Sequence, residues 1–365
     1  MRSHFDGRRV LVTGHTGFKG GWLCLWLKQL GAQVFGYALD PETTPNLFAL
    51  ANVGAAVDDA RGDVRDAQLL MARVEQVKPD IVFHLAAQPI VRASYDDPAS
   101  TFSTNVMGTV NLLESLRRAA RPCSVVVVTT DKCYEDTGGV YAAREIDPLG
   151  GSDPYSASKA CAEIVTASYA RSFFGETSDI RVATARAGNV IGGGDYAVDR
   201  LVPDLVRSIH KKDALRLRNP DAVRPWQHVL EPLSGYLWLA ALLSGRDGRR
   251  VAEPWNFGPS SDSFRTVMEI ATRATRLLDG HPIAVEGSDP NRHEMPSLTL
   301  TTDKARRRLR WAPIWDIDRA VDETMEWYRA TFAGEDAHAS TMKQIATYTK
   351  DAAVAKLPWA TQESV

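Results

Sequence analysis

Residues 9–20 read Arg9-Val10-Leu11-Val12-Thr13-Gly14-His15-Thr16-Gly17-Phe18-Lys19-Gly20. A short apolar run precedes the three glycines, and an apolar helical pattern follows them as far as Leu30. This order predicts a strand, a tight turn and a helix whose N-terminus can hold the pyrophosphate of a dinucleotide. Gly14 would form the turn, Gly17 would let the backbone approach the phosphates, and Gly20 would let the helix pack on its strand.

Strands and helices alternate through the first half of the chain. Apolar or β-branched runs predict further strands at Val34–Tyr37, Ile81–Leu85, Val125–Val128 and Ile180–Ala185. Helical patterns lie near Gly20–Leu30, Ala67–Val77, Thr101–Ala119 and Ser156–Phe173. This alternation predicts an α/β fold with a doubly wound, parallel, Rossmann-like sheet.

Residues that follow the strands should line one crevice, because such sheets bind ligands beyond the carboxyl ends of their strands. These residues are Thr13, Ala86, Thr130 and Ala187. From Gly188 onward, loops rich in glycine, proline and arginine interrupt shorter elements. We therefore expect a dinucleotide-binding domain at 1–187. Residues 188–348 would form mainly a smaller substrate-binding lobe, interwoven with the last strands of the sheet, and 349–365 a tail.

The composition is that of an ordinary soluble globular protein. Among 365 residues, 44% are hydrophobic and 24% charged, and the formal net charge is −2. This balance predicts neither nucleic acid nor a membrane as a partner. The N-terminus lacks the apolar core of a signal peptide, and the four cysteines and eight histidines show no metal-ligand spacing. We expect reduced thiols, a cytoplasmic location and no metal.

A polar strand end and a helix carry the candidate chemistry. The run Val125–Val128 is followed by Thr129-Thr130-Asp131-Lys132, and Tyr155 and Lys159 stand four residues apart on a predicted helix. That spacing places a phenol and an ammonium on one helix face. A neighbouring cation lowers the pKa of a phenol, which can then act as a base near neutral pH. The same spacing is also common on solvated helix faces.

Several longer stretches resemble one family. They are Thr13–Gly20, His84–Pro89, Thr104–Thr109, Asp131–Tyr134, Asp153–Ser156, Arg186–Asp195, Arg224–Val229 and Trp255–Pro259. Together they are similar to the extended short-chain dehydrogenase/reductase family, and within it to the CDP-glucose 4,6-dehydratases. The glycine turn and the Tyr/Lys pair mark only the broad family, whereas Asp131–Tyr134 and Arg186–Asp195 point to the CDP-sugar branch.

The resemblance implies a role for each residue of the strand end and the helix. Tyr155 would remove the proton of the sugar 4-hydroxyl as hydride leaves carbon 4 for the nicotinamide. Lys159 would hold the nicotinamide ribose, and Thr130 would orient the 4-oxygen. Asp131 would be the acid for loss of water across carbons 5 and 6, before hydride returns to carbon 6.

The base that removes the carbon 5 proton is less clear from the resemblance. Related dTDP-sugar dehydratases carry a glutamate where this chain has Lys132. A lysine acts as a base only when it is neutral, which requires desolvation or a nearby cation. We favour Lys132, with Glu135 as the competing base. In another interpretation, Lys132 only pairs with Asp131 and positions it.

The resemblance also implies the cofactor contacts. The candidates are Gly14, Thr16, Gly17, Phe18, Gly20, Asp63, Val64, Ala86, Ala87, Gln88 and Asn105. NAD-specific relatives end the second strand in an acidic residue that binds the adenosine ribose. Here Asp40 comes slightly late, and no arginine stands at that turn to meet a 2′-phosphate. These features favour NAD, and NADP stays an alternative.

The candidates for the nucleotide-sugar are Asn189, Arg200, Arg224 and His228. Arginine binds a pyrophosphate through paired hydrogen bonds, although Arg200 could equally form a surface salt bridge and His228 could be a core histidine. Glu294 is a weaker candidate. The competing functions are a nucleotide-sugar 4-epimerase, a dehydratase for another nucleotide-sugar, and a non-catalytic nucleotide sensor. Relatives often dimerise through the two long helices at 101–119 and 156–173, so we expect a homodimer.

Overall fold

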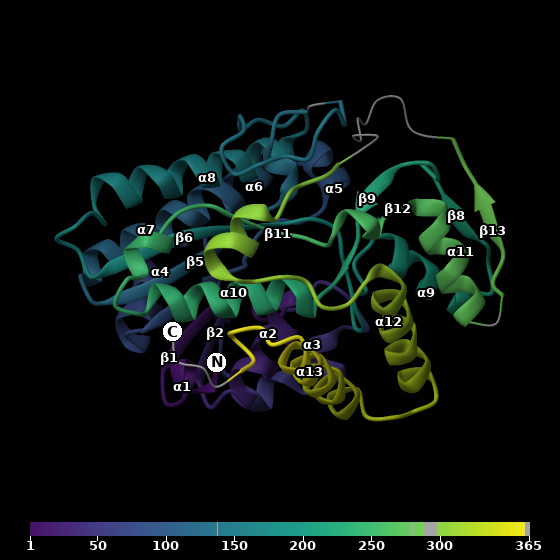
Figure 1. Ribbon diagram of the computed structural model, residues 1–365, viewed down its shortest axis with the longest axis horizontal. Coiled ribbons are helices and arrows are strands. Elements are labelled where there is room, and N and C mark those ends of the chain that lie inside the picture. Colours follow the sequence, from purple (N-terminus) through teal and green to yellow (C-terminus); the bar gives the residue numbers. More distant parts are fainter. Residues whose placement is uncertain (137, 279, 288–297, 362–365) are drawn as a thin grey trace.

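A seven-stranded parallel sheet forms the centre of the protein (Figure 1). The computed structural model describes residues 1–136, 138–278, 280–287 and 298–361. The strand order is β11-β6-β5-β4-β1-β2-β3. The strands are β1 (Arg9–Thr13), β2 (Gln33–Ala38), β3 (Asp58–Arg61), β4 (Ile81–His84), β5 (Cys123–Val128), β6 (Ile180–Ala187) and β11 (Trp255–Phe257). The predicted doubly wound parallel sheet is confirmed.

The sheet is buried on both faces, which explains its continuous apolar runs. All six residues of β5 are buried. Neighbouring residues of β1 pack into different hydrophobic clusters, because successive side chains of a strand point to opposite faces of the sheet. Val10 and Val12 pack into one hydrophobic cluster, and Leu11 packs into the other.

Helices cover both faces of the sheet (Figure 1). One face carries α2 (Phe18–Gln29), α10 (Leu230–Leu243) and α13 (Ala337–Val354), and the other carries α4 (Ala67–Val77), α7 (Gly108–Ala119) and α8 (Pro154–Ser172). A π-helical turn, Ser103–Met107, joins α7 to α6 (Pro98–Phe102). The short helix α1 (Arg2–Phe5) precedes β1, and α3 (Leu47–Leu50) and α5 (Val91–Asp96) lie in connections between longer elements.

Two strands of the sheet lacked a recognisable sequence pattern. Strand β3 is an edge strand that pairs with β2 in parallel, and its residues are exposed or half-buried. A buried arginine from α4 secures this edge, because Arg73 donates to the carbonyls of Gly36 (3.1 Å) and Asp58 (2.8 Å). Strand β11 pairs with β6 at the opposite edge.

The smaller lobe lies beyond the carboxyl ends of the strands, at the right of Figure 1. Its helices are α9 (Leu201–Lys211), α11 (Val267–Leu277) and α12 (Ile317–Phe332). Its short strands pair as β7 (Val190–Ile191) with β10 (Gln227–His228), β8 (Leu215–Leu217) with β13 (Ile283–Val285), and β9 (Val223–Pro225) with β12 (Phe264–Thr266).

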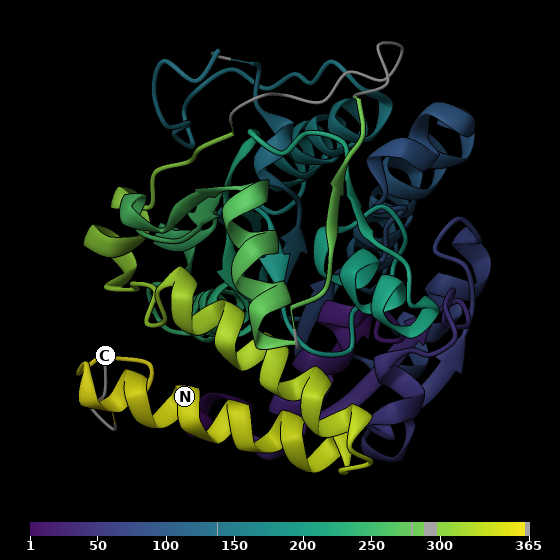
Figure 2. The same cartoon turned by 90° about the vertical axis from the view of Figure 1, so that its right-hand side faces the viewer.

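The C-terminal helix returns to the sheet domain. Figure 2 shows α12 in yellow-green and α13 in yellow crossing one side of the molecule. Helix α13 runs past residue 348, where we expected a tail to begin, and it contacts α2. Beyond it, Trp359 is buried and stacks on Tyr348, with ring centroids 5.9 Å apart. No helix in the described ranges is long and apolar enough to cross a membrane.

Candidate active site

The glycine turn has no room for side chains at two positions. Gly14 follows the first strand with φ +77°, and a Cβ atom there would lie 2.7 Å from the Ala86 nitrogen. A Cβ atom on Gly20 would overlap the carbonyl oxygen of Gly14. Helix α2 begins at Phe18, and within the described chain no side chain caps its N-terminus. Its first N–H groups are therefore available to an anion such as a pyrophosphate.

One large cavity of about 530 Å³ opens at the carboxyl ends of the strands, between the sheet and the smaller lobe. Ala86 and Thr130, which follow strands, and Ala187, the last residue of β6, line it as we expected. Thr13 instead lies in the sheet, where its hydroxyl bonds to Nδ1 of His84 at 2.7 Å.

Most of the predicted site residues line this cavity. They are Gly14, Thr16, Gly17, Phe18, Gly20, Val64, Ala86, Ala87, Thr130, Asp131, Lys132, Tyr155, Lys159, Asn189, Arg200 and Arg224. The structure thus gathers residues that are spread over more than two hundred positions of sequence.

Four predicted site residues lie outside the lining, namely Asp63, Gln88, Asn105 and His228. The Asn105 amide bonds to the backbone of Gln88, at 2.9 and 3.1 Å, and so braces the loop that carries Ala86 and Ala87. The Asp63 carboxylate accepts hydrogen bonds of 2.6–2.8 Å from Arg65. His228 is fully buried between the rings of Trp22 and Trp315. Glu294 lies outside the described residues.

Helix α8 brings the phenol and the ammonium to the end of β5. Asp153 caps the helix by accepting a hydrogen bond from the Ser156 nitrogen at 2.9 Å. Tyr155 and Lys159 are both buried, one turn apart on the inner face. The Lys159 Nζ donates to the carbonyl of Val128, the last residue of β5, at 3.2 Å. The predicted convergence of helix face and strand end is therefore present.

The expected lowering of the Tyr155 pKa is wrong for the protein alone. Burial raises the pKa of Tyr155 to about 12, although a hydrogen bond with Thr130 and the charge of Arg200 oppose the rise. Burial also lowers the pKa of Lys159 to about 8, against the attraction of Glu163. The spacing of the two residues indicates a nearby cation but not the desolvation of both groups, and desolvation has the larger effect on their pKa values.

The polar residues after β5 form a compact cluster. The Thr130 hydroxyl donates to Oδ1 of Asp131 at 3.1 Å, and Nζ of Lys132 lies 3.8 Å from that oxygen. Asp131 is only 1% exposed, and its Oδ2 atom finds no hydrogen-bond partner among the described residues. A buried carboxyl oxygen without a partner is poised for a ligand. Glu135 is exposed and lies beside Gly150, outside the cavity lining.

A buried ion pair behind the cluster supports it, and sequence reasoning missed this pair. Glu163 lies one turn after Lys159 on α8 and pairs with Arg186 of β6 at 2.8 Å. It also accepts hydrogen bonds from Thr129 and Thr184. These contacts connect α8, β5 and β6. Arg186 begins the stretch Arg186–Asp195 that the sequence motifs include, but that stretch does not indicate Glu163 as its partner, so only the contacts reveal the network.

Lys19 is a second residue that we missed. It lies in the first turn of α2 and lines the cavity. Burial, with the charges of Arg200 and Lys159, lowers the pKa of Lys19 to about 7, while Asp131 opposes the change. The sequence feature that could have identified Lys19 is a lysine inside an otherwise apolar first helical turn.

The lobe supplies polar groups to the opposite wall. Arg224, on β9, is 8% exposed, and Arg200 pairs with Asp195 at 2.9 Å. Oδ1 of Asn189 is buried without a hydrogen-bond partner among the described residues. The salt bridge that we weighed for Arg200 exists, yet Arg200 still lines the cavity.

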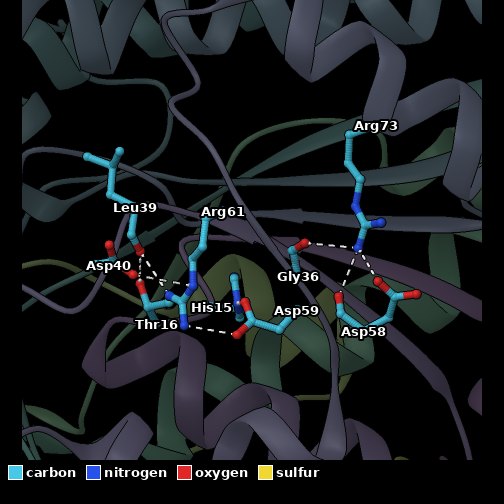
Figure 3. Close-up of polar contacts among 9 residues, drawn as sticks. All are labelled: His15, Thr16, Gly36, Leu39, Asp40, Asp58, Asp59, Arg61 and Arg73. Atoms are coloured by element: carbon cyan, nitrogen blue, oxygen red, sulfur yellow. Dashed lines mark hydrogen bonds and ion pairs between the residues drawn. The ribbon is translucent and has the colours of Figure 1, made fainter.

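An arginine does reach the end of β2, contrary to what the local sequence indicated. Arg61 ends the neighbouring strand β3, and its Nη1 donates to the carbonyl of Leu39 at 3.2 Å (Figure 3). Its Nε lies 3.5 Å from Oδ1 of Asp40. Strand pairing, which places Arg61 beside Ala38, creates this contact.

Comparisons with known proteins assign the family. The model of the GDP-mannose 4,6 dehydratase family matches residues 11–324. The chain belongs to this family. It is 44% identical over 351 residues to a CDP-glucose 4,6-dehydratase of Salmonella typhimurium, which covers 95% of this chain and 98% of the relative. The resemblance drawn from the sequence motifs is confirmed.

Solved structures of a dehydratase and an epimerase share the fold. A dTDP-glucose 4,6-dehydratase of Streptomyces venezuelae, solved with NAD bound, has a TM-score of 0.76 and 27% identity, over 90% of this chain and 98% of that one. A UDP-glucose 4-epimerase of Thermotoga maritima, with a TM-score of 0.75 and 21% identity over 88% and 99%, shows the fold alone. The fold is therefore common to dehydratases and epimerases, and the residues of the site must distinguish them.

Proposed function

We propose that the protein is an NAD-dependent CDP-glucose 4,6-dehydratase that forms CDP-4-keto-6-deoxyglucose. The similarity to a CDP-glucose 4,6-dehydratase over 95% of the chain supports the substrate. The observation that carries the dehydration step is the buried Asp131, whose Oδ2 lacks a hydrogen-bond partner among the described residues and which lines the same cavity as Tyr155. An epimerase needs no acid or base beyond Thr130 and Tyr155.

The cavity fits NAD at its pyrophosphate end. The uncapped N-terminus of α2 and the glycines that exclude side chains form the cradle, and Val64, Ala86 and Ala87 line the wall beside it. Lys159 would bind the nicotinamide ribose. When bound, NAD would supply the hydride acceptor for carbon 4 and, once reduced, the hydride donor for carbon 6.

The residues of the chain would carry the proton transfers. Tyr155 takes the proton of the 4-hydroxyl, and Thr130 holds the 4-oxygen. The resulting 4-ketone makes the carbon 5 proton acidic. Lys132 removes that proton, while Asp131 protonates the 6-hydroxyl, which leaves as water. Asn189, Arg200 and Arg224 would hold the nucleotide diphosphate.

A substrate panel tests this function. The protein is incubated with NAD and, in separate reactions, with CDP-, dTDP-, UDP- and GDP-glucose. The masses of the products are measured by mass spectrometry. We expect loss of one water from CDP-glucose. Loss of water from a different nucleotide-sugar would reassign the substrate. A CDP-sugar epimer without loss of water would favour the 4-epimerase, and no reaction with any of them would refute the dehydratase.

We also propose that the protein is a cytoplasmic homodimer. Large apolar side chains are exposed on the helices that we expect at the interface, namely Phe102, Met107, Ile164 and Phe173. Cys24, Cys123, Cys133 and Cys161 are free thiols, which suits a reducing compartment. Within the chain, 1–187 would bind the dinucleotide and 188–348 mainly the nucleotide-sugar. Analytical ultracentrifugation of Ile164→Glu against wild type tests the dimer.

A further inference from the structure

The end of β2 is joined to two other segments by a chain of polar contacts (Figure 3). His15 of the glycine turn bonds through Nε2 to Oδ1 of Asp59, on β3, at 2.8 Å. Oδ2 of Asp59 accepts from Nη2 of Arg61 at 2.9 Å. Arg61 in turn meets Asp40, two residues beyond β2. The chain therefore runs from the pyrophosphate turn to the far end of the second strand.

Arg61 is held in place from several sides. Its guanidinium stacks on the ring of Phe48, 4.8 Å from the centroid. The carbonyl of Leu39 accepts from Arg61 and also from the Thr16 hydroxyl, at 2.9 Å. The guanidinium N–H groups of Arg61, which could otherwise bind an anion, are thus directed to Asp59, Leu39 and Asp40.

The cluster formed by His15, Asp40, Asp59 and Arg61 carries a net negative charge. Burial lowers the pKa of His15, although Asp59 opposes that shift, so the imidazole stays neutral near pH 7. One guanidinium then faces two carboxylates. Asp40 is almost fully exposed, with 87% of its side chain accessible, and it lines the cavity with Ala38, Leu39 and Gly62.

We propose that Arg61 is a latent 2′-phosphate site that Asp40 and Asp59 neutralise, and that this trio selects NAD over NADP. The inference rests on the proposed function, because it requires a dinucleotide with its adenosine ribose at the end of β2. A ribose with a free 2′-hydroxyl fits beside a carboxylate. A 2′-phosphate carries negative charge and needs a guanidinium with free donors.

Two substitutions should release Arg61 without changing the shape of the site. Asp40→Asn removes the exposed carboxylate. Asp59→Asn removes the second charge, yet keeps an oxygen that can accept the hydrogen bond from His15. Arg61→Met, added to both, removes the guanidinium while retaining an apolar chain over Phe48.

Calorimetric titrations with NAD and with NADP, which measure the affinity for each nucleotide, test the proposal. One charge-assisted contact changes affinity by about tenfold, so the ratio of NADP to NAD affinity should rise about tenfold in Asp40→Asn and about a hundredfold in the double variant. Adding Arg61→Met should abolish the gain. Asp247→Asn, which removes an exposed carboxylate outside the cavity lining, should leave the ratio at the wild-type value.

The proposal is overturned if the double variant changes the ratio by less than about twofold, the usual scatter of such comparisons. It is also overturned if the gain survives Arg61→Met. Both results leave the dehydratase function intact, provided that the wild-type protein binds NAD. A wild-type protein that binds neither nucleotide would instead refute the proposed function, and the selectivity role of Arg61 with it.

Discussion

The ends of β5 and β2 each place a carboxylate in the lining of the same cavity, Asp131 beside Lys132 and Asp40 beside Arg61, yet they differ in burial. At the end of β5, Asp131 is buried, and Tyr155 and Lys159 have pKa values that burial displaces. At the end of β2, Asp40 is exposed to water and Arg61 is partly exposed. Charges interact more strongly where water is excluded. The buried end is thus suited to proton transfer, and the exposed end to choosing between ligands by charge.

The largest expected effect is at the buried end. Tyr155→Phe removes the phenol that takes the 4-hydroxyl proton, and kcat for CDP-glucose should fall about a thousandfold, within the range for loss of a general base. Steady-state kinetics measure it. Tyr141→Phe, at an exposed tyrosine outside the cavity lining, is the matched control and should retain wild-type kcat. Near-normal activity of Tyr155→Phe would remove Tyr155 from the mechanism.

The buried pair behind the site should dominate stability. Glu163→Gln leaves Arg186 charged and unpaired in the interior, and the free energy of unfolding should fall by about 3–5 kcal/mol. Urea denaturation, followed by tryptophan fluorescence, reports the change. Glu326→Gln breaks an exposed pair with Arg329 and should cost less than about 1 kcal/mol. Equal losses in the two variants would contradict the importance of burial.

The next effect separates the two candidate bases. Lys132→Met should slow exchange of solvent deuterium into carbon 5 by about a hundredfold, because the base is lost. Glu135→Gln should exchange at the wild-type rate, since Glu135 lies outside the cavity lining. Mass spectrometry of the product measures the exchange. Unchanged exchange in Lys132→Met would leave Lys132 only the role of positioning Asp131.

The smallest effect is expected at the exposed end. Asp40→Asn breaks a 3.5 Å contact with Arg61 at the surface, and the free energy of unfolding should change by less than about 1 kcal/mol. The same urea titration measures it. A loss as large as that of Glu163→Gln would mean that the β2 end is structural, and the sharp contrast between the two ends would disappear.

Local sequence predicted much of the fold. The predicted helix Ala67–Val77 matches α4 at both ends, and the run Val125–Val128 lies within β5. These segments carry strong apolar patterns because they pack against the core on one or both faces. The edge strand β3 escaped prediction because its residues Asp58–Arg61 are charged except for Ala60, which is half-buried at the margin of a hydrophobic cluster. It forms because β2 offers it a hydrogen-bonding partner.

For the site, sequence alone determined the candidate chemistry where the residues are close in the chain. The glycine turn, the residues after β5 and the Tyr155–Lys159 pair are each local, so spacing and residue type are enough to suggest them. Tertiary structure alone decided which environment each group meets. Burial reversed the expected pKa shift of Tyr155, and strand pairing brought Arg61 to the end of β2. Desolvation and long-range contacts depend on the packing of distant segments, and a linear motif does not record them.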